Sequence, residues 1–152
     1  MFLTSHAAAA LWITTKTTDP LLAFTLGFIS HFALDIIPHG DETLGDHIHD
    51  KRKKYFYLAK IALVDVIVAT AMIWLYVVRK QEIARWPIAI AVFASWLPDF
   101  LWLANSFLKW RFLTLYTRIH DRIHRLINYR YSPVYGVPVQ IIFTIMILKV
   151  MF

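Results

Sequence analysis

The chain has 152 residues and a net charge of +6; 59% of its residues are hydrophobic and 17% charged, against about 45–50% and about 25% in a soluble domain. A helical protein this small has too much surface to bury that apolar excess, so the composition excludes an ordinary soluble domain and indicates one membrane-embedded domain over residues 1–152. The absence of cysteine excludes disulfides and thiolate metal sites, and basic residues placed beside apolar segments favour anionic lipid over nucleic acid as the partner.

The predicted elements, in chain order, begin with a short apolar segment at residues 2–13. It has neither the basic stretch nor the cleavage site of a signal peptide, so we expect it to belong to the fold, with the polar turn at 14–20 folding it back as a hairpin. Four longer apolar segments follow, at 21–38, 58–78, 86–108 and 134–152. Each meets the roughly 17–25 residues that a transmembrane helix needs. The sequence therefore predicts an all-α integral membrane bundle of four long helices with the N-terminal hairpin helix beside them.

The loops between these segments carry most of the positive charge. The loop at 39–57 ends in the basic run 51–54, and in the stretch 109–133 apolar residues recur every three or four positions with arginines between them. The second pattern is typical of an amphipathic helix at a membrane interface. These two stretches hold ten Lys and Arg residues, against four in the turns on the other side. The positive-inside rule therefore places both on the cytoplasmic face of a prokaryotic-type cytoplasmic membrane.

Two pairs of side chains have the spacing of metal ligands on one helix face. His31 and Asp35 are four residues apart, and His120 and His124 repeat that spacing, so each pair projects from a single face. Imidazole and carboxylate together suit zinc, with iron and manganese as alternatives, and zinc lowers the pKa of a water that it binds to roughly 7. The sequence therefore predicts a divalent metal site, with zinc as the first candidate.

Depth in the bilayer brings further residues to the same site. Asp35, Asp65 and Asp99 each lie within nine residues of the cytoplasmic end of their segment, which at about 1.5 Å per residue is the cytoplasmic half of the membrane. The hairpin turn would return His6 to that level. We therefore expect metal ligands at His6, His31, Asp35, His39, Asp99, His120 and His124, with Asp41 following His39 and Asp65 as a further ligand or a partner that orients a histidine.

Each of these residues also has a structural interpretation. A membrane aspartate such as Asp65 can hydrogen-bond a neighbouring helix, and Lys60 can extend to the interface or pair with Asp65. His120 and His124 can be surface residues of a basic helix, and the two histidines within the loop at 39–57 that follow His39 are expected to be solvated. The sequence contains no metalloprotease helix, phosphate-binding loop, dinucleotide fingerprint or nucleophile elbow.

The same positions give the chain a resemblance to a known family. The matching pattern consists of Ser5-His6 before alanines, a Gly-x-x-Ser-His-x-x-x-Asp-x-x-Pro-His-Gly-Asp stretch at 27–41, Asp65, a Leu97-Pro98-Asp99 step, and the late pair His120 and His124. With these residues the chain resembles the uncharacterised membrane-bound metal-dependent hydrolases, which are grouped by similarity with zinc-dependent phospholipase C. Relatives often carry His-Arg-x-x-Thr-His-Ser at the late pair, where this chain has His-Asp-Arg-Ile-His-Arg at 120–125. The resemblance implies a helical metal site and hydrolysis of a phosphoester.

The favoured hypothesis is therefore a membrane-embedded metal-dependent hydrolase that acts on a phospholipid or another phosphoester at the cytoplasmic interface, with arginines neutralising phosphate charge. Two alternatives remain open. A non-catalytic protein would bind metal structurally, or relay protons or ions through the intramembrane acids. A basic adaptor would dock on anionic membrane, and its buried acids would then not come together.

Overall fold

A computed structural model describes residues 1–81, 84–127 and 132–151, and this part of the chain forms helices and no strands. The helices are α1 (Leu3–Thr14), α2 (Pro20–Asp35), α3 (Lys51–Arg79), α4 (Arg85–Leu108), α5 (Arg111–His124) and α6 (Pro133–Met151), with a short 3-10 helix, η1 (Asp41–Thr43), between α2 and α3. The expectation of an all-helical chain is confirmed.

Three helices, α3, α4 and α6, are long and apolar enough to cross a membrane, one fewer than expected. The remaining apolar segment forms α2, which ends at Asp35 after 16 residues instead of continuing to Pro38. Proline disfavours the helical conformation in the residue before it, so a helix arriving at Pro38 has to end early. At about 1.5 Å per residue, α2 spans about 24 Å, less than the roughly 30 Å of a hydrocarbon core.

Two further boundaries differ from the prediction. The basic run at 51–54, expected in a loop, forms the first turn of α3, because the Asp50 side chain accepts a hydrogen bond from the Lys53 N–H at 2.8 Å and caps the helix there. The amphipathic helix ends at His124, and the Leu126 N–H bonds the Ile123 carbonyl in a closing turn. Leu126 and Ile127, expected on that helix, lie beyond it, and 128–131 fall outside the described residues.

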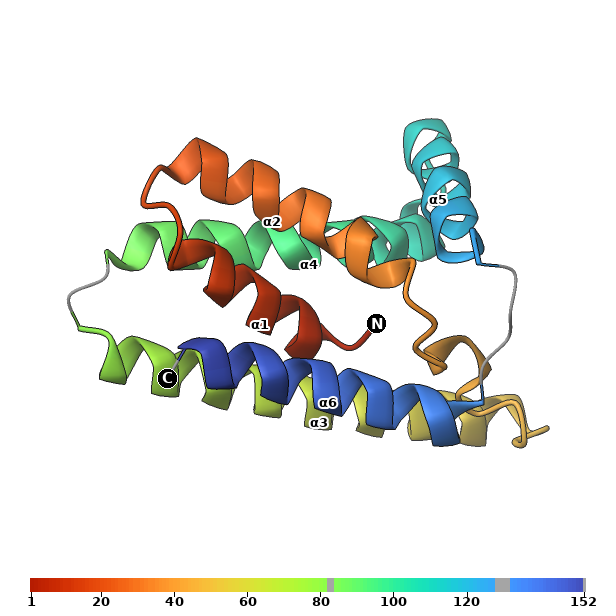
Figure 1. The fold of residues 1–152 in the computed structure, drawn as a ribbon. Helices are drawn as coiled ribbons and strands as arrows, with labels where there is room; N and C mark the ends of the chain where they lie inside the picture. The colour runs from red at the N-terminus through yellow and green to blue at the C-terminus, as the bar shows by residue number, and fades with distance from the viewer. Residues whose placement is uncertain (82–83, 128–131, 152) are drawn as a thin grey trace.

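Helix α1 occupies the centre of the bundle (Figure 1). It contacts α2 and α4 on one side and α3 and α6 on the other. Its Ala7, Ala8, Ala9 and Ala10 are all buried. Small side chains of this kind let the backbones of neighbouring helices approach closely. Helix α5 crosses the ends of α2 and α4, at the end of the bundle where α3 begins with its basic turn.

The outer surface of the bundle is apolar. Helix α3 buries only Ala69 and Tyr76 of its 29 residues, and Leu63, Val64 and Ile142 are each about 60% exposed. Water-facing helices carry polar residues at such positions, and contiguous apolar surface of this extent is typical of contact with lipid or protein. The surface therefore agrees with the length and composition of α3, α4 and α6.

Asp65 of α3 holds the start of α1 in place. Its carboxylate accepts hydrogen bonds from the Leu3 N–H at 2.7 Å, from the Thr4 N–H at 3.1 Å and from the Thr4 hydroxyl. The first N–H groups of a helix have no partner within the helix, so an acceptor from another element is needed when that end is covered. Asp65 supplies that acceptor from a neighbouring helix.

We predict that Asp65→Ala lowers the free energy of unfolding by about 1–3 kcal/mol, because two partly buried N–H groups lose their acceptor. Thermal unfolding of the detergent-solubilised protein measures the change. Asp65→Asn keeps one carbonyl oxygen and should lie between the alanine variant and the wild type. Equal stability of the alanine variant and the wild type would contradict this account of Asp65.

Candidate metal centre

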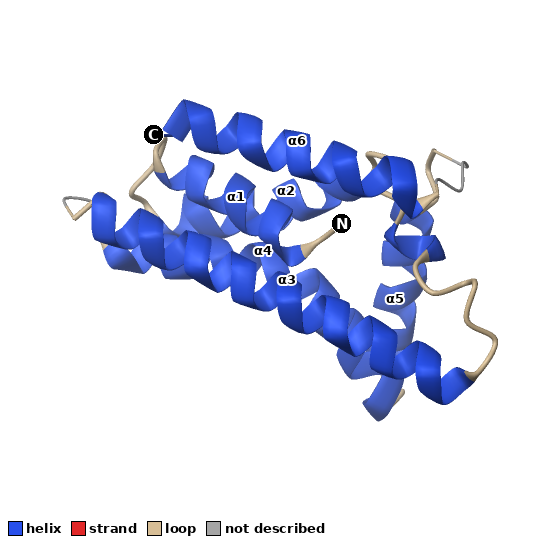
Figure 2. Ribbon diagram, turned by 90° about the horizontal axis from the view of Figure 1, so that it is seen from below, coloured by secondary structure: helices blue, strands red, loops and turns tan. Residues whose placement is uncertain are grey.

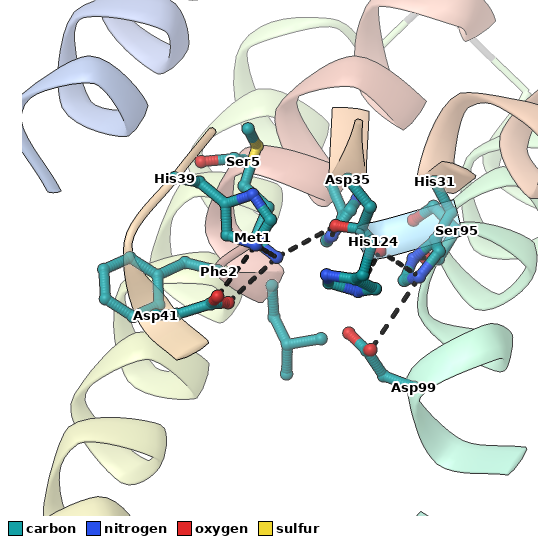
Figure 3. A network of polar contacts seen from close by, with 12 residues as sticks. Met1, Phe2, Ser5, His31, Asp35, His39, Asp41, Ser95, Asp99 and His124 are labelled. Carbon is teal, nitrogen blue, oxygen red and sulfur yellow. Dashed lines mark hydrogen bonds and ion pairs between the residues drawn. The ribbon is translucent and has the colours of Figure 1, made fainter. Parts of the chain in front are cut away.

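The centre forms around Asp35, at the last residue of α2 (Figure 3). Its side chain is 1% exposed, although it is an acid among apolar helices. His31 lies one helical turn earlier on the same face, and its Nε2 approaches Asp35 Oδ2 at 2.8 Å. From α1, the His6 ring stacks on the His31 ring with centroids 4.2 Å apart, and His6 Nε2 is 3.3 Å from Asp35 Oδ1. Helices α1 and α2 therefore bring three ionisable side chains together.

One group of possible ligands joins α2, α4 and α5. It consists of His31, Asp35, Asp99 and His120, which offer ligand atoms within 4.8 Å of one another. The Nε2 atoms of His31 and His120 are 3.3 Å apart, and Asp99 Oδ1 is 3.7 Å from the first and 3.8 Å from the second. A tetrahedral ion with ligands at about 2.0–2.2 Å holds them about 3.3–3.6 Å apart. The group therefore has nearly the dimensions of a four-coordinate site.

A second group shares Asp35 with the first. Here Asp35, His39 and His124 offer the ligand atoms, and His124 Nε2 lies 2.9 Å from Asp35 Oδ2. Asp41 stands beside this group, with its Oδ1 2.8 Å from His39 Nε2. Asp35 therefore belongs to both groups, and its Oδ2 is the oxygen that His31 of the first group and His124 of the second group approach.

Backbone carbonyls fix two of the imidazoles. His31 Nδ1 donates to the Ser95 carbonyl of α4 at 2.8 Å, and His39 Nδ1 donates to the Ile37 carbonyl at 2.6 Å. A carbonyl only accepts, so each Nδ1 carries the proton and each Nε2 is left as the nitrogen that faces the cluster. This is the usual arrangement behind a metal-binding histidine, where the second nitrogen is held by a carbonyl or a carboxylate.

Several polar atoms of the cluster are buried without a hydrogen bond to any described residue. They are both ring nitrogens of His6, Asp35 Oδ2 and His120 Nδ1. His31 and His124 approach Asp35 Oδ2 to 2.8 and 2.9 Å, but these contacts lack the angles of a hydrogen bond. Such atoms are rare in proteins because leaving them unsatisfied is costly. Side chains that point at a common centre instead of at one another suit the coordination of a cation, so the donor set fits a metal.

The charge state of His120 on α5 agrees with metal binding. Burial, with the neighbouring His124 and His31, lowers the pKa of His120 to about 4, so its ring is neutral near pH 7, as a metal ligand must be. Burial also disfavours the charge on His124, but the neighbouring Asp35 carboxylate outweighs that effect and raises the pKa of His124.

A positive charge already lies between the carboxylates. The Met1 amino group is 2.9 Å from Asp35 Oδ1, 3.0 Å from Asp41 Oδ2 and 2.8 Å from His39 Nε2 (Figure 3). Burial disfavours the charged amine, but Asp41 and Asp35 overcome that effect and raise its pKa to about 10. The position between Asp35, Asp41 and His39 is thus electrostatically favourable for a cation.

The His39 loop is held by α6. Gly40 has φ of 72°, a left-handed conformation that favours glycine, and any side chain on Gly136 would collide with the His39 carbonyl. The Gln140 amide donates to that same carbonyl at 2.7 Å. The close approach of two glycines therefore fixes the position from which His39 reaches the cluster.

The cluster forms one wall of a pocket of about 590 Å³. Asp99, His120 and His124 line it beside Arg125, and Leu58, Ile61 and Ala62 of α3 form an apolar opposite wall. The Asp99 side chain is 33% exposed, whereas that of Asp35 is fully buried. The first group is therefore accessible on the Asp99 side, where a ligand can approach.

The structure brings together the seven residues expected as the main metal ligands. Six of them belong to the two groups: His31, Asp35, His39, Asp99, His120 and His124. The seventh, His6, lies against Asp35 and His31 without joining either group. Asp65 differs from the expectation, because its oxygens bond the start of α1 and it belongs to neither group in the described chain. The alternative interpretation of Asp65, a bond to a neighbouring helix, describes it correctly.

Two participants were missed in the sequence. The Ser95 carbonyl is a backbone group, and no side-chain pattern indicates it. Tyr116 precedes His120 by four residues, so the spacing that paired His120 with His124 would also have placed it on this face. Its hydroxyl is buried without a hydrogen bond to a described residue, and its ring lies 6.0 Å from that of His120.

Comparisons of the chain with protein-family models, with curated proteins and with solved structures find no match. The assignment of a function therefore depends on the residues of the site.

We predict that zinc chloride stabilises the protein against heat and that the effect depends on His31. At a free zinc concentration of one hundred times the dissociation constant, binding contributes about 2.7 kcal/mol, or roughly 5–10 °C in melting temperature. His31→Ala should lose the shift, and His47→Ala, in the loop outside the cluster, should keep it. A full shift in His31→Ala would contradict metal binding at this cluster.

Proposed function

We propose that the protein is a membrane-embedded, metal-dependent hydrolase that cleaves a phosphoester at the cytoplasmic interface. The observation that carries the proposal is the buried Asp35 shared by two groups of His and Asp ligands, of which Asp99, His120 and His124 line a pocket. The family resemblance of these same residues supports hydrolysis, and the three helices long enough to cross a membrane support its location. Zinc is the metal proposed first, because nitrogen and oxygen ligands at tetrahedral spacing suit it, with iron or manganese as alternatives.

Different residues would bind the metal and surround the substrate. A divalent metal supplies Lewis-acid polarisation of a phosphoryl oxygen and activation of water near neutral pH. Asp35 and His31 would hold the cation from the buried side, and Asp99 and His120, which line the pocket, would hold it from the pocket side. Leu58, Ile61 and Ala62 give the pocket an apolar side, and apolar surroundings strengthen the electrostatic interactions between these groups and a bound ester.

Arginines of α5 provide the positive charge that a phosphate group needs. Arg125 lines the pocket beside His124, and its Nε donates to the Asp121 carbonyl at 3.0 Å, which fixes the guanidinium near the pocket. Arg118, Arg122 and Arg125 also line a hollow of about 430 Å³ with Asp121. A guanidinium group can donate two parallel hydrogen bonds to two oxygens of one phosphate, so this surface suits the anionic part of a substrate.

Conduction of protons or ions has less support. A relay across a membrane needs ionisable groups distributed through the depth of the bundle. In the described chain the buried histidine and acidic side chains are His6, His31, Asp35, His39 and His120, and all belong to the one cluster. The opening of the cluster into a pocket also differs from a closed structural metal site.

Hydrolysis of bis(p-nitrophenyl) phosphate, a soluble phosphodiester, and of phosphatidylcholine by the purified protein in detergent tests the proposal. We expect zinc-dependent cleavage of at least one, reduced about 100-fold or more by Asp99→Ala and unchanged by His47→Ala, because ligand loss removes both Lewis-acid and water-activating chemistry. Stoichiometric metal without cleavage of either ester would contradict the hydrolase and favour a non-catalytic metal protein.

A further inference from the structure

A groove of about 600 Å³ runs between α3 and α6 on the outer face of the bundle. Both helices pack on α1, but in the described part of the chain they have at most a marginal contact with each other. Figure 2 shows α1 and the N-terminus between the two helices. The walls are formed mainly by Val64 and Val68 of α3 and by Val137, Ile141 and Ile145 of α6.

The floor of the groove offers little to a polar ligand. The Ser5 and Thr144 hydroxyls are 3.1 Å apart and bond each other. The Gln140 side chain uses its oxygen to accept from the Phe2 N–H at 2.7 Å and its nitrogen to donate to the His39 carbonyl. These groups are already satisfied, so the surface left for an occupant is apolar.

We infer that this groove binds one acyl chain of a membrane lipid. Both of its walls belong to helices that are long and apolar enough to cross a membrane, so in a bilayer it opens to hydrocarbon. The α3 wall extends from Tyr57 to Val68, about 16 Å of helix, which is close to half of a hydrocarbon core of roughly 30 Å. Its length thus corresponds to one leaflet, the depth that a single acyl chain occupies.

The charge at the rim matches a phospholipid. Lys60 lines the groove, and a lysine can lay its methylenes along apolar surface while its ammonium stays with a phosphate. Tyr57 lines the same part of α3, where an aromatic ring suits the headgroup level of a membrane. An apolar channel with a cation and an aromatic ring near one end is complementary to an acyl chain below an anionic group.

The groove adjoins the pocket of the metal centre. Phe2, Ile61 and Asp65 line both, so the two cavities lie on either side of the segment that begins α1. A lipid whose chain lies in the groove has its ester groups near that boundary. The inference that the bound lipid is the substrate, and not only a structural lipid, depends on the proposed hydrolase function.

Photocrosslinking tests the groove without reference to catalysis. The probe is phosphatidylcholine with a diazirine on one acyl chain, in vesicles of phosphatidylcholine and phosphatidylglycerol that contain the full-length protein. Val64→Trp should fill the groove from α3, and Ile141→Trp should fill it from α6. The matched controls are Ile67→Trp on α3 and Ile142→Trp on α6, which lie outside the groove lining. Both isoleucines are 58% exposed, similar to Val64 at 60% and Ile141 at 51%.

The expected result is that crosslinks concentrate on the α3 and α6 peptides that line the groove and fall about tenfold in either filled variant, the change that follows a loss of about 1.4 kcal/mol in binding. Both controls should crosslink like the wild type. Labelling spread evenly over the outer faces, or unchanged labelling in both filled variants, would overturn the inference. The two walls of the groove are tested by separate variants, so if one variant misfolds, the other still tests whether the groove binds an acyl chain.

A second copy of the chain is the competing occupant. The chain has no cysteine, so Val64→Cys introduces a single thiol in the groove. Rapid formation of a disulfide-linked dimer in the vesicles, with little lipid labelling, would show that the groove binds a helix of a second copy instead of an acyl chain. Monomeric thiol with lipid labelling supports the inference.

Substrate preference separates this inference from the proposed function. If both hold, Val64→Trp reduces cleavage of phosphatidylcholine more than that of bis(p-nitrophenyl) phosphate, whereas Ile67→Trp alters the ratio of the two rates little. Groove labelling in a protein that cleaves neither ester would contradict the hydrolase alone. Cleavage of the soluble ester without groove labelling would contradict the acyl-chain site alone.

Discussion

The burial of the Asp35 carboxylate is the constraint on which the rest of the site depends. Removing an ion of this kind from water costs several kcal/mol unless opposite charges and hydrogen-bond donors surround it. Here the Met1 amino group supplies the opposite charge and donates to Asp35 Oδ1, and His6, His31 and His124 surround the carboxylate from α1, α2 and α5. Each of these elements is positioned by contacts elsewhere in the fold, which bring its side chain to Asp35. The interactions with Asp35 then stabilise the packing of these elements against one another.

The small residues at the helix contacts make that convergence possible. Gly27 of α2 faces α4, and a Cβ on it would lie 2.6 Å from the Ala91 carbonyl oxygen. Gly136 of α6 permits a similarly close approach to the loop that carries His39. With the alanines of α1, these positions let four helices (α1, α2, α4 and α5) and the loop that carries His39 meet closely enough for imidazole and carboxylate groups to share a centre.

The sequence predicts much of this site because helix geometry is local. The four-residue spacing of His31 with Asp35 and of His120 with His124 determines that each pair shares a face, whatever the tertiary structure is. Depth in the membrane adds Asp99 and His6. Depth alone could not show that Asp65 lies outside the cluster. The position of a residue along a helix gives its depth in the membrane, but not the direction in which its side chain points. Asp65 faces the start of α1, and that contact exists only in the folded bundle.

The same distinction applies to the fold. Hydropathy predicts which segments are helical, but Pro38 shortens α2 and the Asp50 cap lengthens α3, and both effects depend on individual residues at the boundaries. Hydropathy also treats the first segment as an accessory hairpin helix. Its alanines make it the central helix instead, because it fits between two pairs of larger helices.

Metal content measured by mass spectrometry on protein purified without chelator, and resupplied with zinc, tests the central claim most directly. A metal centre built on Asp35 predicts bound metal in the wild type and in His47→Ala and none in Asp35→Ala, which removes the ligand that both groups share. Absence of metal from the wild type, or full retention of metal by Asp35→Ala, would contradict a metal centre built on Asp35.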